Sequence, residues 1–77
     1  MPRFYFDSRD NDDFLSDEVG VELPSVEAAK REASRAMAEL AKDVLPGSVV
    51  RILAIEVRNE LGPVLRVVLR FEIELPA

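Results

Sequence analysis

The last third of the chain alternates apolar and polar residues with a period of two, which restricts it to β-strands. Over residues 64–75 one parity is entirely apolar: Leu65, Val67, Leu69, Phe71, Ile73 and Leu75. The other parity is mostly charged: Val64, Arg66, Val68, Arg70, Glu72 and Glu74. Residues 49–58 repeat the pattern, with Leu53, Ile55 and Val57 apolar. Two strands are therefore predicted, each with one buried face and one mostly exposed face.

The segment between these strands predicts a hairpin with a defined register. A three-residue loop, Glu60–Gly62, keeps both apolar parities on one face and places Gly62 in a left-handed turn position. Three pairs then face each other: Val57 and Leu65, Ile55 and Val67, and Glu56 and Arg66. Residues 49–52 break the parity, so we expect an irregular start to the first strand.

The first 24 residues predict two shorter strands. Residues 3–7 form an aromatic β-type run, with Phe4 and Phe6 on one face. Residues 8–13 are polar and charged and predict a solvated loop, after which Phe14 and Leu15 are expected to turn back onto the core. Residues 18–23 alternate as a second strand. Its inward residues would be Val19, Val21 and Leu23, and Gly20 indicates a bulge or a close backbone approach.

Residues 25–45 have the 3.6-residue period of a helix. Ser25 suits the N-cap and Pro46-Gly47 ends the pattern. The apolar stripe consists of Val26, Ala29, Ala33, Met37, Leu40 and Val44, with Ala36 and Ala41 beside it. Alanines at the contact would let the helix lie close to a sheet.

The predicted fold class is therefore α+β: a two-layer β-β-α-β-β domain over residues 1–77, with a four-stranded, mainly antiparallel sheet and one helix on one face. Two strand orders are compatible with this pattern. The favoured order is 18–23, 3–7, 49–58, 64–75, in which all neighbours are antiparallel. The alternative exchanges the last two strands and requires a parallel pair.

Composition excludes several classes of function. The 77 residues include no Cys and no His, which removes disulfides, thiolate–zinc sites and most nucleophile–base pairs. The net charge of −5 lies entirely within residues 1–24, which disfavours binding to nucleic acid or anionic membranes. No signal peptide or membrane span is evident, so we expect a cytoplasmic location.

Several segments resemble one protein family. They are Met1–Asp7, Asp17–Pro24 and the Glu-Ala-Ala helix start at Glu27–Ala29. Together they are similar to a family of short alphaproteobacterial proteins, common in rhizobia and their relatives, that is known only as a domain of unknown function. The resemblance implies a lineage and a fold, but no activity and no functional residues.

No catalytic, cofactor-binding or metal-binding residues are predicted. The acidic segment with Asp7, Asp10, Asp12 and Asp13 lacks the glycine and the terminal glutamate of a calcium-binding EF-hand loop, so we interpret it as a solvated loop. A thin two-layer domain also leaves little volume for a substrate pocket. We expect a protein that is not an enzyme.

The sheet face opposite the helix is the predicted interaction surface. Its candidate residues are Tyr5, Arg58, Val64, Arg66, Val68 and Arg70. Tyr and Arg are frequent at binding hot spots, and mixed charge suits contact between two copies. We expect a small protein-interaction module that forms a homodimer or docks a partner protein. The alternative is a nucleic-acid-binding or antitoxin-like regulator, by analogy of fold.

Overall fold

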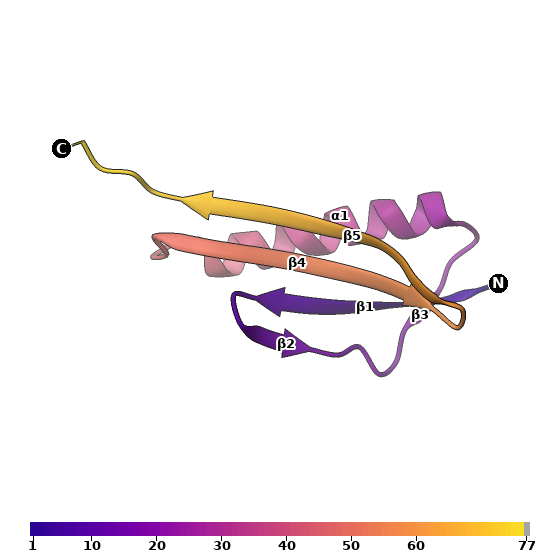
Figure 1. Cartoon of the computed structure of the whole chain (residues 1–77). Helices are drawn as coiled ribbons and strands as arrows, with labels where there is room; N and C mark the ends of the chain where they lie inside the picture. Colours follow the sequence, from indigo (N-terminus) through magenta and orange to yellow (C-terminus); the bar gives the residue numbers. More distant parts are fainter. Residues whose placement is uncertain (77) are drawn as a thin grey trace.

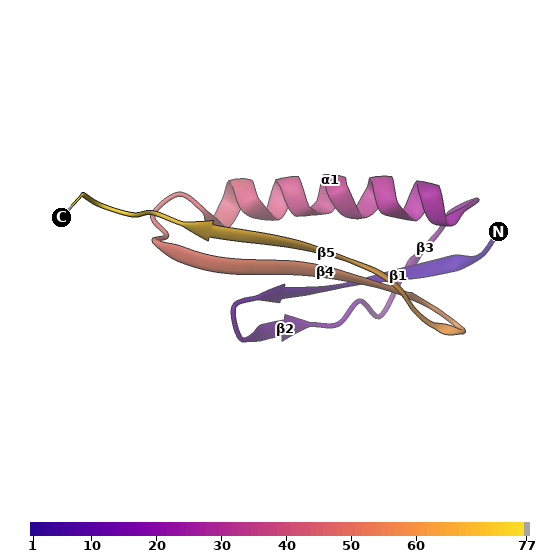
Figure 2. The same cartoon turned by 45° about the horizontal axis from the view of Figure 1, so that its top comes forward.

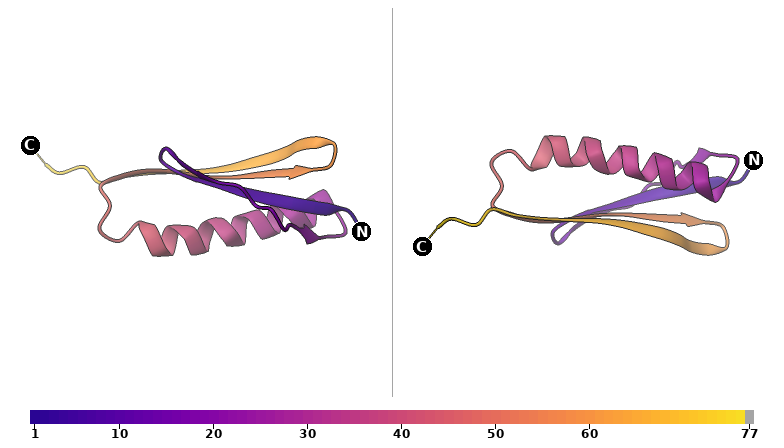
Figure 3. Two further views of the ribbon diagram at one scale, coloured as in Figure 1. Left: turned by 90° about the horizontal axis from the view of Figure 1, so that it is seen from below. Right: turned by 90° about the horizontal axis from the view of Figure 1, so that it is seen from above.

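One helix lies on one face of a twisted antiparallel sheet in the computed structural model, which describes residues 1–76 (Figures 1 and 2). The elements in chain order are β1 (Arg3–Asp10), β2 (Asp13–Leu15), β3 (Val21–Glu22), α1 (Val26–Val44), β4 (Val50–Asn59) and β5 (Gly62–Glu72). The predicted α+β fold class is confirmed. The molecule is elongated, and the two layers are seen edge-on in Figure 3.

The core lies between α1 and the β1, β4 and β5 strands. Ala29 and Ala33 are fully buried, and the flexible Met37 fills the space further along the helix. Opposite them lie the buried side chains of Phe4, Leu53, Ile55 and Val57. The predicted helix is confirmed, including its N-cap: the Ser25 Oγ accepts a hydrogen bond from the Ala28 N–H at 3.1 Å.

The favoured strand order and hairpin register are confirmed. The sheet runs β2-β1-β4-β5, with β3 also on the outer edge of β1, and every pair is antiparallel. Val57 faces Leu65, and Glu56 faces Arg66, as predicted. The turn differs from the prediction: Asn59 already pairs with Gly62, and the register shifts beside Val57 and Arg58. A two-residue turn followed by a bulge at Val64 thus keeps the register that a three-residue loop was expected to set.

The predicted loop over residues 8–13 is wrong. The first strand extends from 3–7 to Arg3–Asp10, and a turn at Asn11-Asp12 leads directly into β2. Asn11 has a φ of 55°, and Asn tolerates this left-handed conformation well. Charged residues continue the strand because each finds a partner on β4: Arg9 contacts Glu56, and Asp10 contacts Arg51.

The predicted strand over 18–23 shrinks to Val21–Glu22. Val19, expected to face inward, is 76% exposed, and Val21 is also exposed, whereas Leu23 does pack against the core. Phe14 and Leu15 do not turn back onto the core and are exposed. These residues lie outside the core because the short β2 and the segment after it follow the outer edge of β1, which α1 does not cover.

The last two strands also differ in extent from the prediction. They span 50–59 and 62–72 rather than 49–58 and 64–75. The irregular start expected at 49–52 is wrong, because Val50 to Ile52 pair in the same register as the rest of the hairpin. Ile73 and Leu75 are exposed rather than buried. A 19-residue helix covers only about 28 Å, whereas the molecule is 52 Å long, so this end of the hairpin projects beyond α1.

Gly20 makes the close backbone approach that the sequence indicated. Its φ is +72°, and a Cβ there would lie 2.8 Å from Cε2 of Tyr5 and 2.9 Å from the Phe4 carbonyl oxygen. Gly47 has a φ of +89°, but a Cβ at that position would meet nothing within 4 Å beyond its chain neighbours. The two glycines thus share a left-handed backbone and differ in the space around them.

We expect Gly20→Ala to lower the free energy of unfolding by about 3 kcal/mol, and Gly47→Ala by about 1 kcal/mol, because only the first adds a steric clash to the left-handed backbone cost. Urea denaturation followed by circular dichroism measures both. Equal losses in the two variants would contradict the close contact between Gly20 and Tyr5.

Candidate functional site

The face of the sheet opposite α1 is not covered by any other element within residues 1–76 (Figure 2). We call it the open face. Cross-strand pairing assigns its residues: Tyr5, Asp7 and Arg9 on β1, Phe14 on β2, Val50, Ile52, Ala54, Glu56 and Arg58 on β4, and Arg66, Val68, Arg70 and Glu72 on β5. One end of this face is a polar network, and the other end carries exposed apolar side chains.

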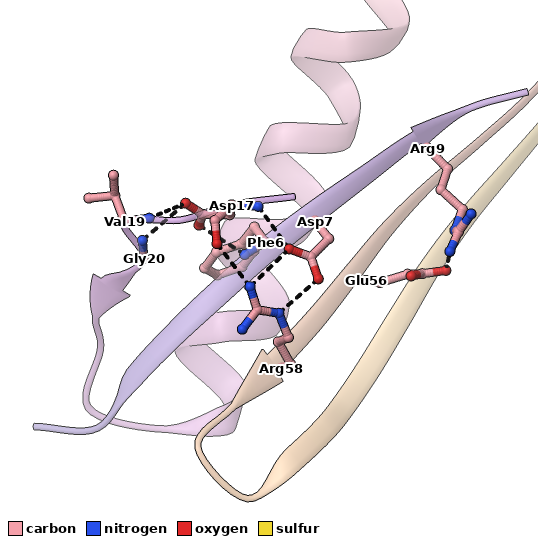
Figure 4. A network of polar contacts seen from close by, with 8 residues as sticks. All are labelled: Phe6, Asp7, Arg9, Asp17, Val19, Gly20, Glu56 and Arg58. Carbon is pink, nitrogen blue, oxygen red and sulfur yellow. Dashed lines mark hydrogen bonds and ion pairs between the residues drawn. The ribbon is translucent and has the colours of Figure 1, made fainter. Parts of the chain in front are cut away.

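Asp17 organises the polar end. β1 pairs with β3 at Arg3 and Phe4 and with β2 from Ser8 onward, so a gap separates the two pairings on this edge. The Asp17 carboxylate fills it: Oδ2 accepts the Phe6 N–H at 3.0 Å, and Oδ1 accepts the N–H groups of Val19 and Gly20, both at 3.0 Å (Figure 4). The Asp17 side chain thus accepts the Phe6 N–H in place of a strand neighbour, and it also holds the turn at Val19 and Gly20.

Asp7 and Arg58 form the ion pair at the centre of this network. Asp7 is only 6% exposed, and its Oδ2 accepts the Arg58 Nε–H at 2.9 Å. Asp7 Oδ1 accepts the Asp17 backbone N–H at 2.9 Å, and Arg58 Nη2 donates to the Asp17 carbonyl oxygen at 2.9 Å. Each group therefore holds the other two, and the segment containing Asp17 is attached to both β1 and β4.

Both carboxylates are held in the ionised form. Burial raises the pKa of Asp7, but the hydrogen bonds from Arg58 and the Asp17 N–H outweigh burial and bring the pKa below the ordinary 3.8. Burial also raises the pKa of Asp17. Hydrogen bonds from three backbone N–H groups and the charge of Arg58 outweigh burial, so the pKa of Asp17 is also lower than its ordinary value. Groups stabilised as anions are poorly suited to donate protons at neutral pH.

Tyr5 is held between this network and the backbone. The Arg58 guanidinium carbon lies 4.5 Å from the centroid of the Tyr5 ring, and Gly20 approaches the edge of the same ring. Arg58 and Tyr5 were predicted to be available to a partner. The structure instead places both in contacts within the chain.

Glu56 neutralises two further arginines in the middle of the open face. Its Oε2 lies 2.9 Å from Nε of Arg9 and 3.3 Å from Nε of Arg66 (Figure 4 shows the first contact). The Arg9 guanidinium carbon also lies 4.5 Å from the centroid of the Phe14 ring, so one face of that ring is covered by a cation. Glu56 and Arg9 thus connect the polar end of the open face to its apolar end.

A concavity of about 480 Å³ lies beside the hairpin turn. It is lined by Asp7, Glu56, Arg58, Arg66 and the bulge residues. Val64, a predicted surface residue, lines this concavity and also packs against the core. The charged side chains around the concavity are already paired with one another, which leaves no free acid, base or nucleophile in it.

The apolar end of the open face carries four apolar side chains that remain exposed. Val50 is 56% exposed, Phe14 48%, Ile52 45% and Val68 38%. Ala54 is buried and lies in a cross-strand row between Val68 and Arg9, and Arg9 in turn pairs with Phe14. Arg70 faces Ile52 and forms no ion pair within residues 1–76. This end therefore combines four exposed apolar side chains with Arg9, which is paired with Glu56, and with the unpaired cation Arg70.

Of the six predicted surface residues, Val68 and Arg70 lie together at the apolar end. Tyr5, Arg58 and Arg66 are held in contacts with charged side chains, and Val64 lies in the bulge. Sequence reasoning missed Asp17, Phe14 and Ile52. The N–H groups that Asp17 binds belong to a neighbouring strand and a turn, which no local pattern reveals. Ile52 could have been found by its even parity on β4, which it shares with Glu56.

No three acidic side chains gather as metal ligands in the part of the chain that is described. Asp7 and Asp10, expected in a solvated loop, instead pair with Arg58 and Arg51. The helix α1 carries charge along its length, and no helix within residues 1–76 has the apolar run that a bilayer span requires.

Comparison with known families places the chain. The family described as Domain of unknown function (DUF6894) matches residues 3–70, which cover all but the ends of the sequence. The chain belongs to the DUF6894 family. The expected resemblance to a domain of unknown function is confirmed at this level, and the match includes all of the polar network and most of β5. No curated protein and no solved structure matches the chain.

We expect Asp17→Ala to lower the free energy of unfolding by about 2 kcal/mol, because the N–H groups of Phe6, Val19 and Gly20 lose their acceptor. Asp17→Asn should lose less, since its one amide oxygen still serves Val19 and Gly20. Chemical denaturation measures both, with Asp12→Ala in the exposed turn as the control. A loss for Asp17→Ala no larger than for Asp12→Ala would contradict the role of Asp17.

Stability should also fall in acid. The pKa values of Asp7 and Asp17 are lower in the folded chain than in the unfolded chain, so the unfolded chain takes up protons first. Their contribution is complete above about pH 4 and is lost as the pH falls through the folded pKa values. Denaturation midpoints across this range should fall less steeply for Asp17→Asn than for the parent chain. Parallel pH profiles would contradict this assignment.

Proposed function

We propose that this DUF6894 protein is a non-enzymatic protein-interaction module that docks a partner protein through the apolar end of its open face. The observation that supports this most directly is that Phe14, Val50, Ile52 and Val68 are all exposed on this one face of the sheet. Apolar side chains that gather on an otherwise charged small protein mark interaction sites. Arg70 beside them favours a partner that supplies a carboxylate next to apolar side chains.

The polar network supports the same proposal in a different way. The contacts among Asp7, Arg58 and Asp17 hold β1, β4 and the connecting segment in one arrangement, so the open face is preorganised. A rigid face loses little conformational entropy on binding. We also propose a cytoplasmic location and an alphaproteobacterial origin, which rest on the sequence and its resemblance.

The contacts do not favour the nucleic-acid alternative. Arg9 and Arg66 are neutralised by Glu56, and Arg58 by Asp7, so Arg70 remains as an isolated cation on this face. Phosphate recognition relies on several free cations together. A mobility-shift assay at low salt should show no retardation of DNA or RNA, and retardation that Arg70→Ala abolishes would favour this alternative instead.

The docking proposal is tested with a double variant, Phe14→Thr/Ile52→Thr, which removes two exposed apolar side chains and keeps β propensity. The parent chain, the double variant and a control are immobilised and exposed to an extract of cells that encode this chain. The control is Val19→Thr/Leu61→Thr, which makes a similar chemical change at exposed positions away from the patch. Captured proteins are quantified by mass spectrometry, and calorimetry with the purified protein follows.

We expect one captured protein to bind the parent and the control equally, and to lose at least about tenfold in affinity for the double variant, in line with apolar hot-spot residues. Circular dichroism confirms that all three chains are folded. Equal binding to the double variant and the parent, or no specific capture by the parent, would overturn the proposal.

A further inference from the structure

We propose that β5 is a dimerisation edge, on which a second copy of this chain adds its own β5 antiparallel, centred on Leu69. β5 is 11 residues long and lies at the end of the sheet, paired only with β4 (Figure 1). An uncovered edge of this length presents a row of free backbone N–H and C=O groups. The proposal does not rest on partner docking, because it uses the backbone edge of β5 and not Phe14 or Ile52, although Val68 and Arg70 of the docking surface lie on the same strand.

Backbone geometry defines which residues of β5 are available. The Ile73 N–H donates to the Val49 carbonyl oxygen at 2.8 Å and so points toward the side of β4. Successive residues of a strand point their backbone groups to opposite sides, and the ladder has no register shift between Leu65 and Glu72. The outward groups therefore belong to the even residues: Arg66, Val68, Arg70 and Glu72.

This parity limits the registers that a second copy can adopt. Even residues must face even residues, since otherwise the outward N–H and C=O groups of the two strands do not meet. The same condition keeps the apolar and charged faces of the two strands aligned. The two-fold axis must therefore pass through a residue of β5, and charge then distinguishes the candidates.

A centre at Leu69 gives the most favourable pairs. Arg66 then faces the partner's Glu72, and by symmetry Glu72 faces the partner's Arg66. A centre at Val68 would place Arg66 opposite the partner's Arg70 twice, and a centre at Arg70 would place two copies of that arginine together. A centre at Phe71 would pair Arg70 with the partner's Glu72, but β5 ends at Glu72, so far fewer residues of the two strands would pair than with a centre at Leu69. A centre at Val67 would use the bulged start of the strand and forms no opposite-charge pair.

The helix-side face of β5 matches the same register. Leu69 meets the partner's Leu69, Val67 meets the partner's Phe71, and Leu65 meets the partner's Ile73. Leu65, Val67, Leu69 and Phe71 are only half-buried in one copy, and Ile73 is 47% exposed. α1 crosses the sheet obliquely and its C-terminal half lies behind β4, which leaves the C-terminal end of β5 uncovered (Figure 1). Pairing would thus bury apolar surface that one helix does not reach.

Charge reversal tests both the interface and its register. Arg66→Glu places the new carboxylate opposite the partner's Glu72, and Glu72→Arg places two arginines opposite each other, so each variant alone should dimerise at least about tenfold more weakly. Mixed in equal amounts, the two variants should form a heterodimer. Each homodimer has two facing pairs of like charge, whereas the heterodimer has two facing pairs of opposite charge. In the heterodimer, one facing pair joins the introduced carboxylate to the introduced guanidinium, and the other joins the original Glu72 to the original Arg66.

The rescue cannot come from a contact inside one copy. Arg66 and Glu72 are about 20 Å apart along β5, too far for their side chains to meet. Recovery of dimerisation in the mixture therefore reports a contact between two chains in the proposed register.

Analytical ultracentrifugation over micromolar to millimolar concentrations measures the dimer dissociation constants, and native mass spectrometry detects the heterodimer. Arg70→Glu is the matched control: it makes the same charge reversal on the same strand, but it faces the partner's Val68 and should not weaken the dimer. A chain with N-methylated Val68, which lacks one outward N–H and keeps every side chain, should be monomeric.

A parent chain that stays monomeric at millimolar concentration, variants that dimerise like the parent, or a mixture without heterodimer would each overturn the proposal. The Phe14→Thr/Ile52→Thr variant separates the two proposals. If it loses partner binding and still dimerises, the open face and the edge act independently. If it dimerises like the parent and binds the partner like the parent, only the docking proposal fails.

Discussion

The close packing of α1 on one face of the sheet is the contact on which the rest of this structure depends. Ala29 and Ala33 have no side chain beyond Cβ, so the helix backbone lies close to Phe4 and Leu53. A single helix of this length covers only part of a sheet made from a long hairpin. The uncovered parts are the open face, the edge of β5 and the end beyond the helix, and both proposed binding surfaces lie among them.

The polar network compensates for a weakness in the same design. The outer edge of β1 is covered by two very short strands, which leaves the Phe6 N–H without a strand partner. Asp17 supplies that acceptor, and Asp7 with Arg58 anchors the segment that carries it. An ion pair that is satisfied on all sides contributes little net stability compared with an apolar cluster, but it specifies one arrangement of the strands. The acidic start of the chain therefore has a structural use beyond solubility.

Local pattern was sufficient for the helix and the C-terminal hairpin. Ser25, the alanine-rich stripe and Pro46 define α1 through interactions within a few residues. In the hairpin, the alternation on both strands requires facing residues of the same parity, and the short turn before Gly62 then selects the register in which Val57 faces Leu65. The acidic N-terminal third was less predictable. Charged residues such as Arg9 and Asp10 indicate a loop when read alone, and become strand residues only when β4 supplies their partners.

The amino-acid sequence on its own therefore settled the class of fold, the helix, the pairing of β4 with β5 and the absence of thiol or imidazole chemistry, because each follows from composition or from short-range periodicity. Tertiary structure decided which charged residues form ion pairs within the chain and which remain unpaired on the surface. Arg58 and Arg70 look equivalent in the sequence, yet Arg58 is bound by Asp7 and the Asp17 carbonyl, whereas Arg70 lies beside Ile52 on the open face. That difference depends on strands that are distant in the chain and adjacent in space, and no local pattern encodes such neighbours.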